Sequence, residues 1–151
     1  MNLFILGLNH ETAPIALRER VAFSASELRD AVASLRTATQ LEEAVILSTC
    51  NRTEIICAGS IDDREAIIHW LAQDRHCDLS ALTPSSYQHA QTDAVSHLIR
   101  VSVGLDSMII GEPQIFGQMK DAFLASADIG ATGPLLEPLF QHIFNLSLIH
   151  I

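Results

Sequence analysis

The order of strand-like and helix-like segments constrains the fold of this chain more than any other feature. Short apolar runs rich in β-branched and aliphatic residues predict four strands. These lie at 3–8, 44–47, 53–58 and, more weakly, 86–90. Apolar residues at helical intervals predict helices at about 25–38 and about 63–76. The order β-α-β-β-α-β predicts an α+β fold, a ferredoxin-like split βαβ antiparallel sheet with helices on one face.

Helices follow this sheet in the last third of the chain. They are expected at about 92–103, at about 114–127 and from 134 onward. Expected helix starts elsewhere are Pro14, the capping pair Ser24 and Glu27, and Asp62 or Asp63. No G-x-G-x-x-G motif occurs, so a dinucleotide-binding fold is not predicted.

Length and charge limit the class of protein. A chain of 151 residues suits one domain, and 48% hydrophobic residues exclude wholesale disorder. Nine basic and 18 acidic residues give a formal net charge of -9, with Lys120 as the single lysine. A fold that binds nucleic acid mainly by counterion release would carry a basic patch. A polyanionic partner must therefore be held locally or by something outside this chain.

The cysteines indicate a reducing compartment. Cys50, Cys57 and Cys77 form no CxxC pair, and one stays unpaired in any disulfide connectivity. The apolar N-terminus lacks a basic n-region and no apolar run reaches the length of a membrane span, so we expect a cytoplasmic protein without a membrane partner. Histidines and cysteines lack metal-ligand spacing, which disfavours a metal site.

Cys50 is the candidate nucleophile. It ends a predicted strand and opens a polar turn, with Arg52 two residues later. A guanidinium and turn amides at this position would lower the pKa of the thiol. The alternative, a small buried hydrophobic residue, is favoured by composition alone. Cys57 and Cys77 are expected to have only that structural role.

His97 lies on a predicted helix with Ala94 and Val101 as neighbours, so its side chain is expected to face an apolar interior. Such a histidine is usually a satisfied core residue, and the alternative is a general acid or base opposite the thiol. Further polar groups surround a predicted helix start. They are Ser107, Glu112, Gln114 and Gln118. Spacing leaves open whether they cap the helix or form a binding wall.

Four segments in register resemble a known family. In chain order they are GLNHETAPIALRERVAF, STCNRTE, AVSHLIRVSVGLDS and GEPQIFGQMK. Together they closely resemble the N-terminal catalytic domain of glutamyl-tRNA reductase, over nearly all of residues 3–145. The resemblance implies NADPH-dependent reduction of glutamyl-tRNA to glutamate-1-semialdehyde through a thioester on Cys50. That reaction is the first step of five-carbon tetrapyrrole (porphyrin) biosynthesis.

The resemblance also implies roles for single residues. Thr49, Asn51 and Arg52 would line the substrate site beside Cys50, with Arg52 holding the glutamate side-chain carboxylate in a bidentate grip. His97 stands at the position that the family needs for activity, and proton transfer is its expected role. The residues expected around the glutamyl group are Ser107, Glu112, Pro113, Gln114 and Gln118.

The resemblance sets expectations for the domain boundaries. Residues 1–145 are expected to form the catalytic domain, with 134–145 as the start of a truncated connecting helix. Residues 146–151 are expected to be a non-native tail, because they break the amphipathic helix pattern and match what a common sequencing-library adapter would encode. The family's NADPH-binding and dimerisation domains are not expected here, which limits the fragment to acyl transfer. The homodimer and a contact with the downstream aminomutase belong to the full-length family.

Two other functions compete with this interpretation. One is a non-catalytic module that binds a glutamyl group or a partner protein, and it requires no reactive thiol at Cys50. The other is an unrelated cysteine hydrolase built on Cys50 and His97, but Arg52 and Glu112 favour an acidic substrate.

Overall fold

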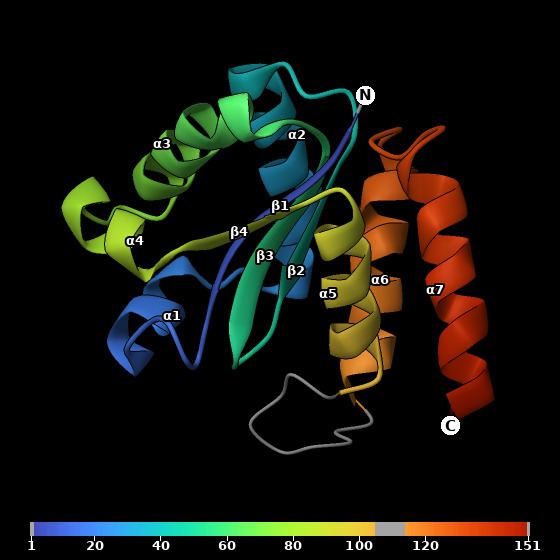
Figure 1. The fold of residues 1–151 in the computed structure, drawn as a ribbon. Helices are drawn as coiled ribbons and strands as arrows, with labels where there is room; N and C mark the ends of the chain where they lie inside the picture. The colour runs from blue at the N-terminus through green and yellow to red at the C-terminus, as the bar shows by residue number, and fades with distance from the viewer. Residues whose placement is uncertain (1, 105–113, 151) are drawn as a thin grey trace.

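The structure is a computed structural model that describes residues 2–104 and 114–150, without the side chains of residues 147–150. A four-stranded antiparallel sheet with the order β2-β3-β1-β4 lies at its centre (Figure 1). The strands are β1 (Asn2–Asn9), β2 (Ala44–Ser48), β3 (Arg52–Gly59) and β4 (Tyr87–Ala90). All four predicted strands are confirmed, and their bounds differ from the prediction by one residue at most.

Seven α-helices surround the sheet in the described part of the chain. They are α1 (Ile15–Val21), α2 (Leu28–Thr39), α3 (Arg64–Asp74), α4 (Leu79–Ser85), α5 (Thr92–Ser102), α6 (Gln114–Asp128) and α7 (Leu136–His150). Two short 3-10 helices, η1 (Ala25–Glu27) and η2 (Ile61–Asp63), lead into α2 and α3. The helix α4 was not predicted. The helices that were predicted are confirmed, although some of their ends are shifted.

Local capping explains where two of these helices begin. The predicted pair is present before α2, where the Ser24 N–H donates to Glu27 Oε1 at 2.9 Å. Asp63, one of the two expected residues, is at the N-cap position of α3, but its side chain makes no capping hydrogen bond there, and Ser60 caps the preceding η2. Its hydroxyl accepts from the Asp62 N–H at 3.2 Å, and its own N–H donates to Asp63 Oδ2 at 2.8 Å.

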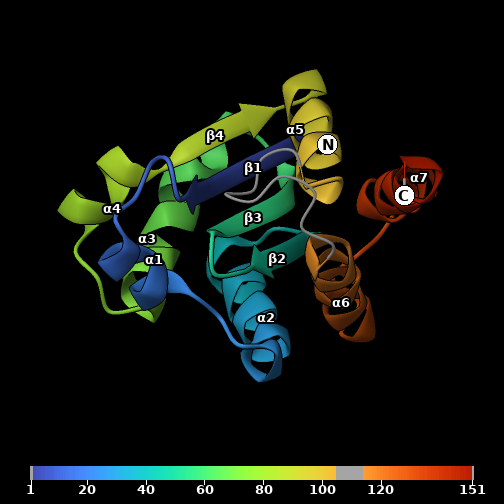
Figure 2. The ribbon, with the colours of Figure 1, turned by 90° about the horizontal axis from the view of Figure 1, so that it is seen from below.

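Helices cover both faces of the sheet, so the prediction of helices on one face is wrong. Figure 2 shows α5, α6 and α7 on the side opposite α3. In β1, Phe4 and Leu6 pack in the core that contains α2 and α3, whereas Leu3 and Ile5 pack in the core formed with α5, α6 and α7. The unbroken apolar run of β1 reflects this double coverage, because a strand buried on both faces has no polar alternation.

Glu43 connects the edge strand β2 to α7. Its carboxylate is buried and accepts from the N–H groups of Leu135 at 3.2 Å and Leu136 at 2.8 Å. Next to it, the Ala44 N–H donates to the Ala131 carbonyl oxygen at 2.9 Å. Glu43 therefore satisfies N–H groups at the start of α7 that the helix itself cannot satisfy.

The helix α7 continues to His150 and includes residues 146–150, whose sequence departs from the amphipathic pattern before them. Residues 146–150 contain neither proline nor glycine, and a helix that has already formed extends easily through such residues. The non-native origin of residues 146–151 stays a prediction. Within the described residues, no helix combines the length and apolar character needed to cross a bilayer.

Candidate active site

Cys50 lies exposed at the tip of the β2–β3 hairpin. Beyond the strands, the Thr49 N–H donates to the Arg52 carbonyl oxygen at 2.8 Å and closes the turn. The Asn51 N–H donates to Thr49 Oγ1 at 3.1 Å, and Arg18 Nη1 from α1 donates to the Cys50 carbonyl oxygen at 3.3 Å. Hydrogen bonds on both sides of Cys50 therefore fix the backbone that carries this thiol.

The three cysteines are free thiols in different environments. Cys57 is buried, its Sγ donates to the Phe4 carbonyl oxygen at 3.5 Å, and burial raises the pKa of this thiol to about 12. Burial also raises the pKa of Cys77, although the nearby Arg20 acts in the opposite direction. The alternative of a buried hydrophobic role for Cys50 is wrong, because Cys50 is the exposed thiol of the three.

A cavity of about 340 Å³ opens beside Cys50 and is called the Cys50 cavity below. Its polar lining consists of Ser48, Thr49, Cys50, Gln118 and Asp121. Its apolar lining consists of Ala22, Phe23, Ala25, Leu28 and Ala122. The cavity thus brings together three predicted site residues, two from the hairpin and one from α6.

A buried charged cluster lies on the α5 side of the sheet. The carboxylate of Glu54 is fully buried, and its Oε1 accepts from Arg52 Nη1 at 3.0 Å and from the Tyr87 hydroxyl at 2.9 Å. His97 Nε2 is hydrogen-bonded to both oxygens of Glu54, with 2.8 Å to Oε2. The His97 ring also stacks on His89, with 4.3 Å between the centroids. Arg52 and His97 therefore meet through Glu54.

The surroundings of Glu54 keep it ionised. Burial by itself would raise the pKa of Glu54, but the hydrogen bond and charge of His97, the Arg52 guanidinium and the Tyr87 hydroxyl outweigh burial and lower the pKa below its ordinary value. Gly7 pairs with Glu54 in the ladder and leaves room for it. A Cβ at Gly7 would lie 2.8 Å from Glu54 Cγ, so a larger residue there would displace the carboxylate.

His97 is buried as predicted, but it faces a carboxylate rather than the expected apolar interior. Glu54 was not among the predicted site residues. A signal was present, because a charged residue inside the apolar strand segment TEIICA must find a partner when it is buried. His97 also lines a second cavity of about 540 Å³, together with Asn9, Thr12 and Arg100. Cys50 is not among the described residues that line it.

The other predicted site residues are distributed around the hairpin and α6. Asn51 is buried at the hairpin tip, and Gln114 is exposed at the start of α6. Ser107, Glu112 and Pro113 lie outside the described residues. Within the residues that the structure describes, no cluster of His, Cys, Asp or Glu side chains is arranged to hold a metal ion.

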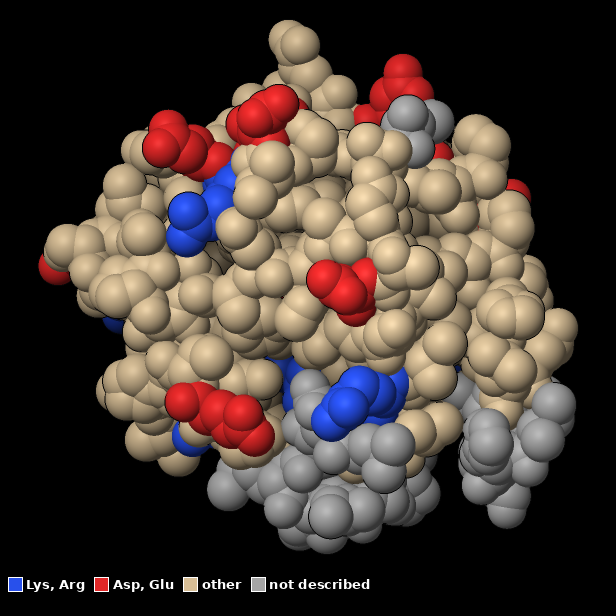
Figure 3. Space-filling view, in the orientation of Figure 1, with Lys and Arg blue, Asp and Glu red and all other residues tan. Residues whose placement is uncertain are grey.

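Charged side chains of both signs are interspersed on the described part of the face shown in Figure 3. On the described part of the face shown in Figure 3, basic groups are small and stand among acidic ones, so no continuous basic area is present there. This arrangement agrees with the formal net charge of -9.

Comparisons with known proteins agree on one family. The family model described as "Glutamyl-tRNAGlu reductase, N-terminal domain" matches residues 6–148. The glutamyl-tRNA reductases of Halorhodospira halophila and Marinobacter nauticus are 50% and 46% identical over 147 residues, which cover 97% of this chain and 33% and 34% of those proteins.

The fold agrees with the sequence match. The solved structure of glutamyl-tRNA reductase from Methanopyrus kandleri superposes with a TM-score of 0.79 at 29% identity, over 97% of this chain and 33% of that chain. The chain spans about a third of the length of the relatives it matches. Because the family model, the sequence relatives and the sheet with its helices all agree, the chain belongs to the glutamyl-tRNA reductase family and corresponds to its N-terminal domain.

Proposed function

We propose that this domain takes the glutamyl group of glutamyl-tRNA onto the sulfur of Cys50. The thiolate attacks the ester carbonyl carbon, a C–S bond forms, and the bond from that carbon to the 3′ oxygen of the tRNA breaks. The proton lost by the thiol ends on the 3′ oxygen, which leaves as a hydroxyl. The observation that carries this proposal is the exposed thiol at a hydrogen-bonded hairpin tip, on a cavity lined by Thr49 and Gln118.

Specific roles are proposed for Arg52 and His97 from their chemistry, since neither is among the described residues that line the Cys50 cavity. A planar guanidinium holds a carboxylate through two parallel hydrogen bonds, so Arg52 suits the side-chain carboxylate of the glutamyl group and would distinguish it from glutamine. The bond from Arg52 Nη1 to Glu54 fixes the orientation of that guanidinium. His97, held by the same carboxylate, is proposed to transfer the proton to the leaving oxygen.

Several neighbouring residues are proposed to contact the glutamyl group. They are Thr49, Asn51, Ser107, Glu112, Pro113, Gln114 and Gln118. The support from the described residues is uneven, since Thr49 and Gln118 line the Cys50 cavity whereas Gln114 lies exposed at the start of α6.

For the whole protein we propose NADPH-dependent reduction of glutamyl-tRNA to glutamate-1-semialdehyde in the cytoplasm, within tetrapyrrole biosynthesis. The described residues do not fit a dinucleotide, because their sheet is antiparallel and the sequence contains no G-x-G-x-x-G motif for a pyrophosphate. The homodimer and the aminomutase contact stay predictions.

The test is to incubate the purified chain with tRNA charged with radioactive glutamate, digest the RNA and measure acid-stable label on the protein. Wild type is expected to carry label that hydroxylamine removes, as a thioester would. Cys50→Ser is expected to carry none, whereas the matched control Cys77→Ser keeps it. Equal labelling of Cys50→Ser and wild type would contradict the proposal. Binding of the charged tRNA without any label would favour the non-catalytic module.

A further inference from the structure

Part of the Cys50 cavity is formed by a segment outside the helices and strands. Ala22 and Phe23 follow α1, line the cavity, and lead into η1. Ala22 and Phe23, together with Val21 at the end of α1, are called the wall segment below. Because no regular element holds Ala22 and Phe23 in place, their position depends on contacts from other parts of the chain.

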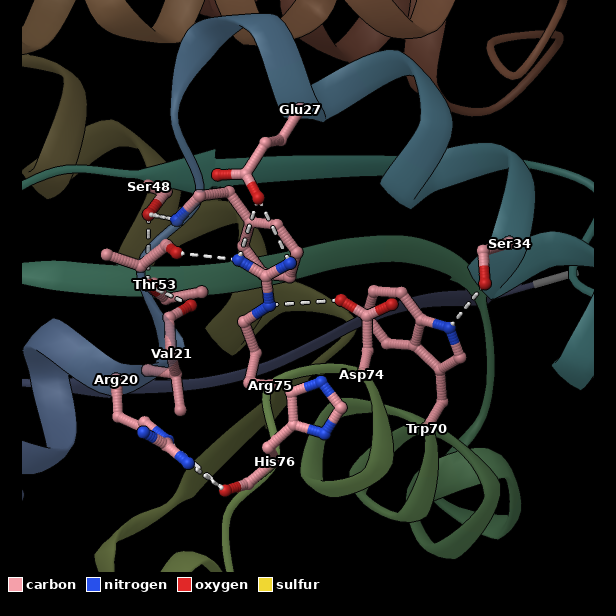
Figure 4. Close-up of polar contacts among 12 residues, drawn as sticks. Arg20, Val21, Glu27, Ser34, Ser48, Thr53, Trp70, Asp74, Arg75 and His76 are labelled. Atoms are coloured by element: carbon pink, nitrogen blue, oxygen red, sulfur yellow. Dashed lines mark hydrogen bonds and ion pairs between the residues drawn. The ribbon is translucent and has the colours of Figure 1, made fainter.

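One set of contacts joins the wall segment to the hairpin that carries Cys50 (Figure 4). The Phe23 N–H donates to Ser48 Oγ at 2.9 Å, and Ser48 Oγ is 3.1 Å from Thr53 Oγ1. The Thr53 hydroxyl lies 3.5 Å from the Val21 carbonyl oxygen. The final pair of the β2–β3 ladder thus holds one side of the wall segment.

Arg75, the residue after α3, holds the other side. Its Nη1 donates to the Ala22 carbonyl oxygen at 3.0 Å, and its guanidinium carbon lies 4.0 Å from the centroid of the Phe23 ring. The Phe23 ring in turn stacks on Trp70 of α3, with 6.0 Å between centroids and 3° between the planes. Arg75 therefore contacts both the backbone and the ring of the wall segment.

Acidic partners fix the orientation of Arg75. Its Nε donates to Asp74 Oδ2 at 3.0 Å, and Nη1 and Nη2 both lie 3.2 Å from Glu27 Oε2. Glu27 also accepts from the Ser24 N–H, so the same carboxylate holds the backbone just after the wall segment. A planar fork that binds two carboxylates and a carbonyl at once has one permitted orientation.

A second arginine makes the reciprocal contact. Arg20 of α1 donates through Nε and Nη2 to the His76 carbonyl oxygen, at 3.1 Å and 2.8 Å. His76 has a positive φ of 54°. The wall segment is thus bracketed by two arginine-to-carbonyl contacts that cross between the end of α1 and the end of α3, as Figure 4 shows.

From these contacts we propose that Arg75 is a positioning residue, which sets the wall of the Cys50 cavity through Ala22 and Phe23 without touching the substrate. This inference rests on the function proposed above, because it concerns the cavity in which glutamyl transfer would occur. Loss of Arg75 would let the wall segment move relative to the hairpin, and misplacing a reactant by about 1 Å can cost on the order of 10²-fold in rate.

The experiment compares Arg75→Met with wild type and with the control Arg29→Met. Arg29 pairs with Asp128 on the surface at 2.6 Å, so its replacement removes an arginine and an ion pair but none of the contacts to the wall segment described above. Two rates are measured on protein shown to be folded by circular dichroism. The first is the rate of single-turnover glutamyl transfer to Cys50. The second is the rate of Cys50 alkylation, measured with small iodoacetamide and with a bulky pyrene maleimide and expressed as the bulky-to-small ratio.

We expect Arg75→Met to slow glutamyl transfer roughly tenfold or more and to raise the bulky-to-small ratio of alkylation rates. Arg75→Lys keeps the charge but loses the planar guanidinium. It should therefore also slow glutamyl transfer and raise the alkylation ratio, as Arg75→Met does. Arg29→Met should match wild type. A merely structural role would lower the stability of Arg75→Met and leave both readouts of the folded protein unchanged, and that result would overturn the proposal.

Two further outcomes keep the proposal decidable. If Arg75→Met does not fold, Glu27→Gln removes the carboxylate that orients Arg75, and an unchanged alkylation ratio in that variant would overturn the proposal. If wild type accepts no glutamyl group, the proposed function is wrong, whatever the role of Arg75. The alkylation ratio then still decides the role of Arg75, because it requires no tRNA.

Discussion

At the scale of single residues, Glu54 links the two groups on which the proposed chemistry depends. One buried carboxylate accepts from Arg52 at 3.0 Å and is hydrogen-bonded to His97 at 2.8 Å. A buried charge without partners is costly, and here each charged group satisfies another. The orientation of the guanidinium and of the imidazole is therefore a property of Glu54 as much as of Arg52 and His97.

Replacing Glu54 by glutamine is expected to lower the free energy of unfolding at pH 7 by about 3 kcal/mol, the scale for removing one member of a buried pair. The pKa of Glu54 is lower in the folded protein than its ordinary value, which the unfolded chain is taken to have. Its stabilisation is therefore complete above the unfolded pKa and is lost as the pH falls through the folded pKa.

Urea unfolding over a series of pH values measures this effect. The difference between wild type and Glu54→Gln should be largest near neutral pH and should shrink as the solution becomes acidic. A difference that stays constant over the whole series would contradict the ionised state assigned to Glu54.

The thiols provide a second prediction at this scale. Iodoacetamide near neutral pH is expected to modify Cys50 first, because it is exposed, and Cys57 last, because burial raises its pKa to about 12. Peptide mass spectrometry of samples taken over time gives the order, and labelling in urea gives the rates without burial. Faster modification of Cys77 than of Cys50 would count against Cys50 as the nucleophile.

At the scale of elements, runs of apolar residues and capping pairs predicted strands and helices well. Short segments and single polar residues did not reveal their structure or their partners. The apolar runs located every strand, and the pair Ser24 and Glu27 located the start of the second helix. The helix α4 escaped prediction because seven residues that include Pro84 are too few to show a helical period. Coverage of the second sheet face is indicated in the sequence by the lack of polar alternation in β1.

The role of Glu43 could not be predicted from local sequence, because it depends on a contact with residues more than ninety positions away. Glu43→Ala is expected to destabilise the domain by about 2 kcal/mol, since the Leu135 and Leu136 N–H groups lose their acceptor. Hydrogen exchange at these two amides should accelerate. The exposed neighbour Glu42 is the matched control, and Glu42→Ala should change stability by no more than about 0.5 kcal/mol. Equal effects of the two variants would exclude the capping role.

At the scale of the whole molecule, motifs identified candidate residues but not how they meet. Cys50, Arg52 and His97 stand out in the sequence through their types and motifs. That Arg52 and His97 share Glu54 follows from the pairing of β1 with β3 and from the packing of α5 over that face, which residue spacing does not encode. Sequence also gave no reason to expect the Cys50 cavity to include residues from the segment after α1.

The charge of the whole domain leads to the last prediction. Several arginines donate to groups of the fold itself: Arg20 to a carbonyl, Arg75 to a carbonyl and two carboxylates, and Arg52 to a buried carboxylate. Arg18 and Arg36 also donate to carbonyl oxygens. With nine basic residues and a net charge of -9, the domain has few groups to displace counterions from a tRNA.

Glutamyl transfer by this chain should therefore depend only weakly on salt. Each phosphate contact contributes a slope of about -0.7 to -0.9 to a plot of log affinity against log salt concentration. One or two contacts predict a slope for kcat/KM of about -1 to -2 between low and physiological potassium chloride. Alkylation of Cys50 by neutral iodoacetamide, measured in the same series, controls for salt effects on the thiol itself. A slope steeper than about -4 would mean that the domain holds the tRNA backbone through a basic surface, which would contradict the interspersed charges on its described face.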